Sequence, residues 1–423
     1  MIKCGIYEID ITPNLGHEVP GQFYKRKSDG VKEPLCCEAV YFENNGSKAV
    51  IFAVDILMMS AKFCGSVRER VAEALDMPGE AVMLSATHSH TAGPIYATEG
   101  HPFINDYMEF LAGRMVSAAT IAASEAREVV LSYAVGYEDK LGYCRNFVEE
   151  DGRYHTWGGT TKSKPLAEPD HDVCVLRIDN TDGSPYGVIA NHACHCDCVG
   201  GTQYSSDYPG EMRRLLRVIY GQNFKPVFIN GFAGNINHND PCSNFSKEIP
   251  SHYKRMGRML AADVVRTREM AVKPFEDETV AGQLDVMVFS TRVPDAELVK
   301  WAEGVLANPN ANDNDRSYAN GVKRYEKING KPEDVPVQVI KIGELAIYGM
   351  PGEAYSDYGK MLKSRSPLKY NIPAYLSNGD FGYIPTLDAY HPGIYEARIG
   401  ANKLEPNAGN AMVDRLIELA NKF

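Results

Sequence analysis

The sequence predicts an α/β protein in which helices flank a mixed sheet. Short apolar runs typical of strands alternate with segments of helical period along most of the chain. Two pairs of these runs are joined by short polar turns, which predicts β-hairpins and hence antiparallel neighbours in the sheet. The 423 residues, 44% of them hydrophobic, can bury one large core with an appendage. We therefore expect a single domain over residues 1–423.

Strand and helix signals alternate through the first two thirds of the chain. The expected strands cover residues 5–13, 39–43, 49–57, 81–84, 129–136, 173–178, 186–191 and 226–230. The expected helices cover 61–75, 105–126, part of 207–220, and 252–270. Asn44-Asn45-Gly46 predicts a tight hairpin turn. Residues 142–171 show no period, so we expect a long surface loop there, and such loops are often functional.

A helical insertion is expected in the last third of the chain. Residues 295–306 and 316–328 have helical spacing and flank an exposed Asn- and Asp-rich segment. Strands are expected over 279–292, 335–345 and 346–349, and an amphipathic helix from Asn407 ends the chain. The domain core would then comprise residues 1–275 and 330–423, with the insertion over 293–330.

Charge and composition exclude some partners. The net charge of −11 offers no excess of Lys or Arg for nucleic acid or for an anionic membrane. The N-terminus lacks the apolar run of a signal peptide, and the ten cysteines have poor spacing for a disulfide framework. We expect a cytoplasmic protein with reduced thiols and a small-molecule substrate, and a homo-oligomer is possible.

Metal-competent side chains follow several predicted strands. His88 and His90 lie two positions apart after an apolar run, so in an extended segment they share one face. Neutral imidazole is the commonest metal ligand in proteins, although a pair of hydrogen-bonded structural histidines would give the same pattern. His192, Asn237 and Glu353 follow other short strands. Two or three histidines plus a carboxylate, with a position left for water, are typical of catalytic zinc.

Taken together, these motifs resemble those of the neutral ceramidases and their shorter bacterial relatives. The motifs stand in the family's order over most of the chain, and the spacing of the last two tyrosines also matches. They are the run Gly5 to Pro13, His88-Ser89-His90-Thr91-Ala92-Gly93-Pro94, His192 followed by Ser206-Asp207-Tyr208-Pro209-Gly210, the loop Gly234 to Asn239, Pro351-Gly352-Glu353, and Tyr383 to Tyr395-Glu396. The resemblance implies the α/β catalytic domain of that family, without its immunoglobulin-like C-terminal domain.

The resemblance also implies one Zn²⁺ per chain. Its ligands would be His88, His192, Glu353 and Tyr383, together with a water whose pKa the zinc lowers to about 7. For Glu353, capping of the following helix is the structural alternative, and for Tyr383 it is a place in the core.

Three further residues would act on the substrate if the resemblance extends to chemistry. His90 would hold the water or the leaving group, and Tyr395 and Arg145 would polarise the substrate carbonyl. Two such donors stabilise a tetrahedral oxyanion by roughly 3–4 kcal/mol each. An exposed loop position is the alternative for Arg145.

The chain also departs from the family pattern. Asn237 stands where ceramidases carry a serine, and an amide is no nucleophile although it can donate a hydrogen bond. His238 replaces a proline of the same loop and would contact the substrate, and Asp207 would orient His192 or His90. Cys194, Cys196 and Cys198 alternate with polar residues, and we expect small buried thiols there rather than a second metal site.

Three functions remain open from the sequence. The first is a zinc-dependent hydrolase that cleaves an amide or related acyl bond of a small polar substrate, and that is not a true ceramidase. The second is a metal-dependent lyase or isomerase of a hydroxylated, sugar-like compound. The third is a binding protein that keeps zinc without catalysis.

Overall fold

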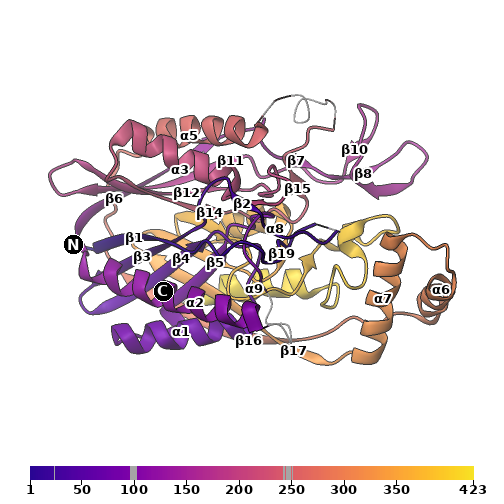
Figure 1. Cartoon of the computed structure of the whole chain (residues 1–423). Helices are drawn as coiled ribbons and strands as arrows, with labels where there is room; N and C mark the ends of the chain where they lie inside the picture. The colour runs from indigo at the N-terminus through magenta and orange to yellow at the C-terminus, as the bar shows by residue number, and fades with distance from the viewer. Residues whose placement is uncertain (23, 96–101, 242, 244–248, 250) are drawn as a thin grey trace.

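An eight-stranded mixed sheet organises the computed structural model of the chain, which describes residues 1–22, 24–95, 102–241, 243, 249 and 251–423 (Figure 1). Its strands are β1 (Lys3–Asp10), β3 (Cys36–Asn44), β4 (Ser47–Val54), β5 (Val82–Ala86), β6 (Arg127–Tyr137), β11 (Asp172–Asn180), β12 (Pro185–His192) and β14 (Lys225–Asn230). The strand order is β14-β12-β11-β6-β1-β3-β4-β5. Only the β12–β14 and β4–β5 pairs are parallel in this sheet. The predicted α/β class with a mixed sheet is confirmed.

Both predicted hairpins are present in this sheet. β3 and β4 pair in antiparallel register across a two-residue turn. The turn residues Asn45 and Gly46 have φ of 50° and 82°, which is the backbone that a tight hairpin requires and that Asn and Gly adopt readily. β11 and β12 form the second hairpin, with a register shift near Asp179.

A second, four-stranded sheet packs against the first. Its strands, in spatial order, are β16 (Val280–Ser290), β17 (Pro332–Ile342), β18 (Leu345–Gly349) and β20 (Tyr370–Ala374). Helices α8 (Ser356–Arg365) and α9 (Ala408–Ala420) cover β20 and β17. The main hydrophobic core fills the space between the two sheets, with Phe52, Leu84 and Ile347 fully buried in it.

Helices cover both sides of the eight-stranded sheet (Figure 1). α1 (Ala61–Leu75) and α2 (Pro102–Ser124) pack at one side, against β5, β1 and β3. α3 (Asp207–Tyr220) and α5 (His252–Met270) pack at the other side, where Val188, Met212 and Leu260 belong to a second core. The bounds of α1, α3 and α5 agree with the sequence expectation. None of the described helices combines the length and apolar character needed to cross a membrane.

The two helices of the predicted insertion are α6 (Ala296–Ala307) and α7 (Asp313–Ile328), which project from one end of the molecule (Figure 1). They share a small core of their own that includes Ala302, Ala319 and Val322. α7 begins three residues earlier than expected because the Asn312 side chain accepts a hydrogen bond from the backbone N–H of Asp315 and caps the helix. α7 forms one wall of a cavity described below.

The segment 142–171, expected to be irregular, contains short strands. β8 (Asn146–Val148) lies between β9 (Tyr154–Thr156) and β10 (Lys164–Pro165) in a small sheet. The remaining short elements are β2 (Gly30–Val31), η1 (Gly79–Ala81), β7 (Tyr143–Cys144), β13 (Gln203–Tyr204), β15 (Ile236–Asn237), β19 (Glu353–Ala354), β21 (Tyr383–Ile384), η2 (Leu387–Ala389) and η3 (Tyr395–Ala397). Cross-strand pairing rather than local pattern forms the short strands among them, so the sequence alone does not predict those strands.

The two edge strands of the large sheet, β5 and β14, approach each other where they end. The Asn230 side-chain amide donates to the carbonyl of Thr87 (3.0 Å). The backbone N–H of Tyr375 donates to Asn230 (3.0 Å), and the Tyr375 carbonyl accepts from the Ser85 hydroxyl (2.7 Å). The ends of β5, β14 and β20 therefore meet at one point, and the candidate site lies there.

A buried ion network supports this meeting point. The guanidinium of Arg213 on α3 contacts Glu38 and Asp55 at 2.5 Å each, and all three side chains are at most 3% exposed. Asp55 also accepts from the hydroxyl of Thr87 (3.1 Å), the residue before His88. The network thus ties α3 to the end of β5.

Replacing Arg213 with methionine tests this network. Arg213→Met leaves two carboxylates buried without a cation, so we expect the free energy of unfolding to fall by about 3–5 kcal/mol. Arg214→Met is the matched control, because that side chain is 58% exposed and its pair with Glu211 contributes about 0–1 kcal/mol. Urea unfolding of both variants gives the comparison, and equal destabilisation would contradict the assignment.

Candidate metal centre

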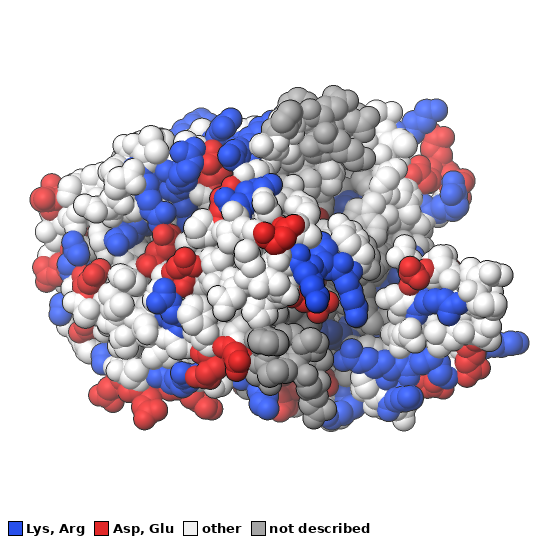
Figure 2. All heavy atoms as spheres, in the orientation of Figure 1, with Lys and Arg blue, Asp and Glu red and all other residues white. Residues whose placement is uncertain are grey.

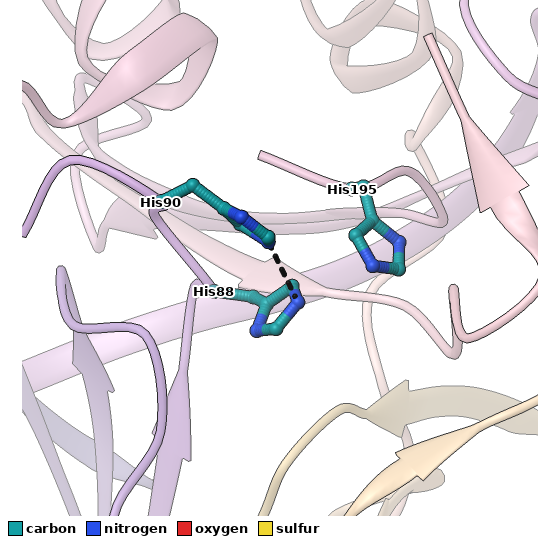
Figure 3. A group of neighbouring side chains, drawn as sticks. All are labelled: His88, His90 and His195. Atoms are coloured by element: carbon teal, nitrogen blue, oxygen red, sulfur yellow. Dashed lines mark hydrogen bonds between the residues drawn. The ribbon is translucent and has the colours of Figure 1, made fainter. Parts of the chain in front are cut away.

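Three imidazoles converge where the strand ends meet (Figure 3). His88 and His90 come from the turn after β5, and His195 comes from the turn after β12. One ring nitrogen from each lies within 4.8 Å of the others. The backbone N–H of His90 donates to the carbonyl of Cys196 (3.0 Å), which holds the two turns side by side.

The three imidazoles are anchored in the same way, through Nδ1. The carbonyl partners are Leu57 for His88 (2.9 Å), Gly21 for His90 (2.6 Å), and Ala233 and Ile236 for His195 (2.8 and 2.9 Å). A carbonyl oxygen only accepts, so each Nδ1 must carry the proton and each Nε2 of a neutral ring must present a lone pair. Fixing the tautomer in this way is how proteins orient histidines toward a metal.

The contact between two of these nitrogens supports a cation in the centre. Nε2 of His88 lies 3.1 Å from Nε2 of His90, so two lone pairs face each other when both rings are neutral. The carboxylate of Glu353 lies 3.3 Å from Nε2 of His88 and 3.3 Å from Nε2 of His195. Imidazole nitrogens with a carboxylate oxygen are the donor set that zinc prefers, so these residues fit the metal that the sequence predicts.

Short parallel strands place Glu353 in the cluster. β19 and β21 pair in register, with Glu353 directly beside Tyr383. The turn before Glu353 needs glycine, because Gly352 has φ of 80° and a Cβ there would lie 2.6 Å from the Gly382 carbonyl. Since Glu353 faces the histidines and α8 begins only at Ser356, the capping alternative is not what the structure contains.

Glu353 and the histidines shift one another's pKa values. Burial opposes a charge on His88, but Glu353 outweighs it and raises the pKa of this ring. Burial opposes ionisation of Glu353, but the rings of His88 and His195 outweigh it and hold the pKa of this carboxyl well below its usual range. Burial, reinforced by the neighbouring His88, lowers the pKa of His90 to about 3. The site therefore presents an ionised carboxylate and a neutral His90 imidazole.

Arg145 lies beside the cluster and is buried, so the exposed-loop alternative is wrong. It follows β7, and its guanidinium donates to Glu396 (2.6 Å) and to the carbonyl of Gly234 (2.9 Å). A third nitrogen lies 3.2 Å from Nε2 of His195. Burial opposes its charge, but Tyr383 and Glu396 outweigh this and raise the pKa of Arg145 well above its usual range.

Tyrosines 383 and 395 extend from the cluster toward a cavity. The guanidinium of Arg145 lies 5.3 Å from the centre of the Tyr383 ring. The rings of Tyr383 and Tyr395 pack edge to face, with their centres 5.7 Å apart. Tyr383 is buried in the site as a predicted ligand requires, and its coordination stays a prediction. Tyr395 lines a cavity of about 610 Å³, and residues of α7 line it as well. The cavity lies next to the projecting lobe that carries α6 and α7 (Figure 2).

Asn237 sits at the end of β15, next to the carboxylate of Asp197. Its side-chain amide donates to both oxygens of Asp197 (3.2 and 2.9 Å), and its carbonyl oxygen accepts from Asn239 (2.8 Å). Nε2 of His238 lies 3.3 Å from the same carboxylate. Asn237 therefore holds Asp197 in place, and the substrate contact expected of His238 stays a prediction.

His192, predicted as a metal ligand, does not join the cluster. Its Nδ1 donates to the carbonyl of Asp172 (3.1 Å), and His195 takes the place expected for it. Side chains alternate along β12, so His192 lies on the same face as Val188 and Ala190, which belong to the core under α3 and α5. The chain must turn after His192 before a histidine can face the other way.

Asp207 does not orient a histidine either. Its carboxylate accepts from the backbone N–H groups of Val199 (2.9 Å) and Tyr208 (2.6 Å). Burial raises the pKa of Asp207 to about 6, and its φ of 57° is unusual for a residue with a side chain. It stabilises the turn that follows His195 instead.

Sequence reasoning missed several residues of the site. His195 lies in the run Cys194 to Cys198, where cysteines alternate with His195 and Asp197. This alternation places the two polar side chains on the face opposite the thiols, and it was the available signal for His195. Tyr375, whose hydroxyl donates to Glu353 (3.2 Å), belongs to no motif. Glu396, which pairs with Arg145, was visible only as the neighbour of Tyr395.

Comparison with solved structures identifies the fold. The crystal structure of neutral ceramidase from Pseudomonas aeruginosa superposes with a TM-score of 0.78 and 17% identity, covering 99% of this chain and 74% of that one. The chain has the fold of a neutral ceramidase. A structure described as ceramidase complexed with C2 matches with a TM-score of 0.72, 16% identity and the same coverage. No protein-family model and no curated protein sequence matches the chain.

Metal content of two histidine variants tests the ligand assignment. We expect the wild type to contain about one zinc per chain. His195→Ala should lose it, because this change removes one Nε2 donor of the cluster, whereas His192→Gln should retain it. Elemental analysis of the purified proteins gives the ratio of zinc to chain. Loss of zinc from His192→Gln with retention in His195→Ala would reverse the assignment.

Proposed function

We propose that the protein is a zinc-dependent hydrolase that cleaves an amide or related acyl bond of a small polar substrate. The observation that carries this proposal is the convergence of three Nε2 atoms and the Glu353 carboxylate beside a buried arginine. The ceramidase fold supports the same reaction class, since the solved structures that share it are those of ceramidases. One Zn²⁺ per chain would be held by His88, His195 and Glu353, with Tyr383 as a further ligand.

The chemistry divides between the metal and the side chains around it. When bound, zinc supplies Lewis acidity and a nucleophile at neutral pH. The Arg145 guanidinium, fixed by its pair with Glu396, would donate to the oxygen of the substrate carbonyl as negative charge develops. The Tyr395 hydroxyl would add a second donor from the cavity side. His90, neutral at pH 7, would accept a proton and return it to the leaving group.

The cavity beside Tyr395 supports a polar substrate. Asn320, Arg324 and Arg398 line it, together with the aromatic rings of Trp157 and Tyr318. Apolar surface predominates in the cavity, but the two guanidinium groups can pair with an anionic or strongly polar group of a substrate, which a ceramide lacks, so we propose a polar substrate rather than ceramide. The described cysteines are free thiols, which supports the reducing cytoplasm as the place of action.

Oxygen labelling separates hydrolysis from the lyase or isomerase alternative. N-acylated amino acids and N-acylated amino sugars, incubated with the zinc-loaded enzyme in ¹⁸O-water, should yield a carboxylate that carries one ¹⁸O from the solvent. Conversion without ¹⁸O would favour a lyase or isomerase, and no conversion of any acylated substrate would favour a binding protein.

The roles of Arg145 and Tyr395 are tested by kinetics against a hydrolysed substrate. Arg145→Lys and Tyr395→Phe each remove a positioned donor, and we expect kcat to fall by roughly 10²–10³-fold with zinc content unchanged. Tyr390→Phe is the control, since it removes a tyrosine hydroxyl from the same region. The ring of Tyr390 packs against the guanidinium of Arg292 rather than against Arg145. A matching loss in Tyr390→Phe would show that the effect is structural.

Asn237→Ser tests whether the serine of the family is sufficient for ceramide cleavage. We expect no ceramidase activity, because the Asn237 amide is bound to Asp197 and the variant leaves Arg324 and Arg398 in the cavity. Release of fatty acid from a short-chain ceramide is the assay. Robust release by this variant would contradict the proposed substrate class.

A further inference from the structure

A second group of metal-competent side chains lies near the first and takes no part in the proposed reaction. Cys198, His238 and His252 each place one ligand atom within 4.8 Å of the others. Cys198 follows the turn of His195, His238 follows β15, and His252 begins α5. Three elements far apart in the sequence therefore bring a thiol and two imidazoles together.

Three of the four ring nitrogens in this group lack hydrogen-bond partners among the described residues. Both nitrogens of His252 and Nδ1 of His238 are buried without a partner there. The His252 side chain is only 7% exposed, and its ring lies 5.2 Å from that of His238. A buried polar nitrogen without a partner is destabilising. A cation bound between His238 and His252 would accept lone pairs from their nitrogens and remove this cost.

A neighbouring carboxylate prepares one of the two imidazoles. Asp197 lies 3.3 Å from Nε2 of His238, so in the neutral ring the proton is on that atom and the lone pair is on Nδ1. A carboxylate behind a histidine is a common support for a metal ligand. The Asn237 amide holds Asp197 from the other side, so the carboxylate is not free to move.

Sulfur atoms complete the donor set. The thiol of Cys198 lies 3.1 Å from the thioether of Met256. Met256 is four residues after His252 on α5, so both side chains share one face of the helix. Thiolate and imidazole together select zinc or another thiophilic ion over calcium or magnesium.

We propose that Cys198, His238 and His252 bind a second Zn²⁺ per chain, with Met256 beside it. On binding, the Cys198 thiol gives up its proton and its sulfur donates to the metal. The ion would connect α5, through His252, to the segments after β12 and β15, through Cys198 and His238. It would also hold in place the ring of His238, which contacts Asp197 two residues after His195.

Cobalt substitution tests this site with a signal that the first site cannot produce. The first cluster contains no thiol, so a thiolate-to-cobalt charge-transfer band in the near ultraviolet reports the second site alone. The protein, freed of metal with a chelator and titrated with Co²⁺, should bind about two ions per chain and develop this band. Cys198→Ser should abolish the band and bind about one ion.

Two further variants distinguish this proposal from the proposed function. His88→Ala should bind one ion fewer and keep the full thiolate band, and Cys36→Ser, which removes another partly exposed thiol, should match the wild type. If Cys198→Ser does not fold, His252→Ala should weaken the affinity that the band reports by at least tenfold. A wild type without the band, or a band that survives both Cys198→Ser and His252→Ala, would overturn the second site and leave the first untouched.

Discussion

The candidate centre depends on one repeated interaction, the hydrogen bond from Nδ1 of each histidine to a backbone carbonyl. Because carbonyls cannot donate, the bonds at His88, His90 and His195 fix the tautomer of all three rings. Three lone pairs then face one another across a few ångströms in a site closed to most solvent. Such an arrangement suits a cation, although the Arg145 guanidinium already lies 3.2 Å from Nε2 of His195.

This arrangement requires the strand ends to meet. The edge strands β5 and β14 approach through the Asn230 amide, and the segment after β20 binds to both. His88 has a φ of 71°, a strained backbone that persists because the surrounding hydrogen bonds determine it. Behind the site, the ion network of Arg213 connects α3 to the same strand end. Fold and site are therefore stabilised by the same contacts.

Much of the fold was predictable from the sequence because local patterns carry it. The Asn45-Gly46 turn and the apolar periods of α1 and α5 fix their elements directly. The site was predictable where a motif lies on a strand end, as at His88 and Glu353. It was not predictable at His192 and His195, because a turn reverses which residue faces the site. Tyr375 and Glu396 enter through contacts between distant segments, which no local pattern records.

The central claim is that a metal ion lies between His88, His195 and Glu353. Anomalous diffraction at the zinc edge, from crystals of the zinc-loaded protein, tests it most directly. The account predicts an anomalous peak about 2.0–2.1 Å from Nε2 of both histidines, with the Glu353 carboxylate in contact. A peak at His192 instead, or none at this cluster in zinc-loaded crystals, would contradict it.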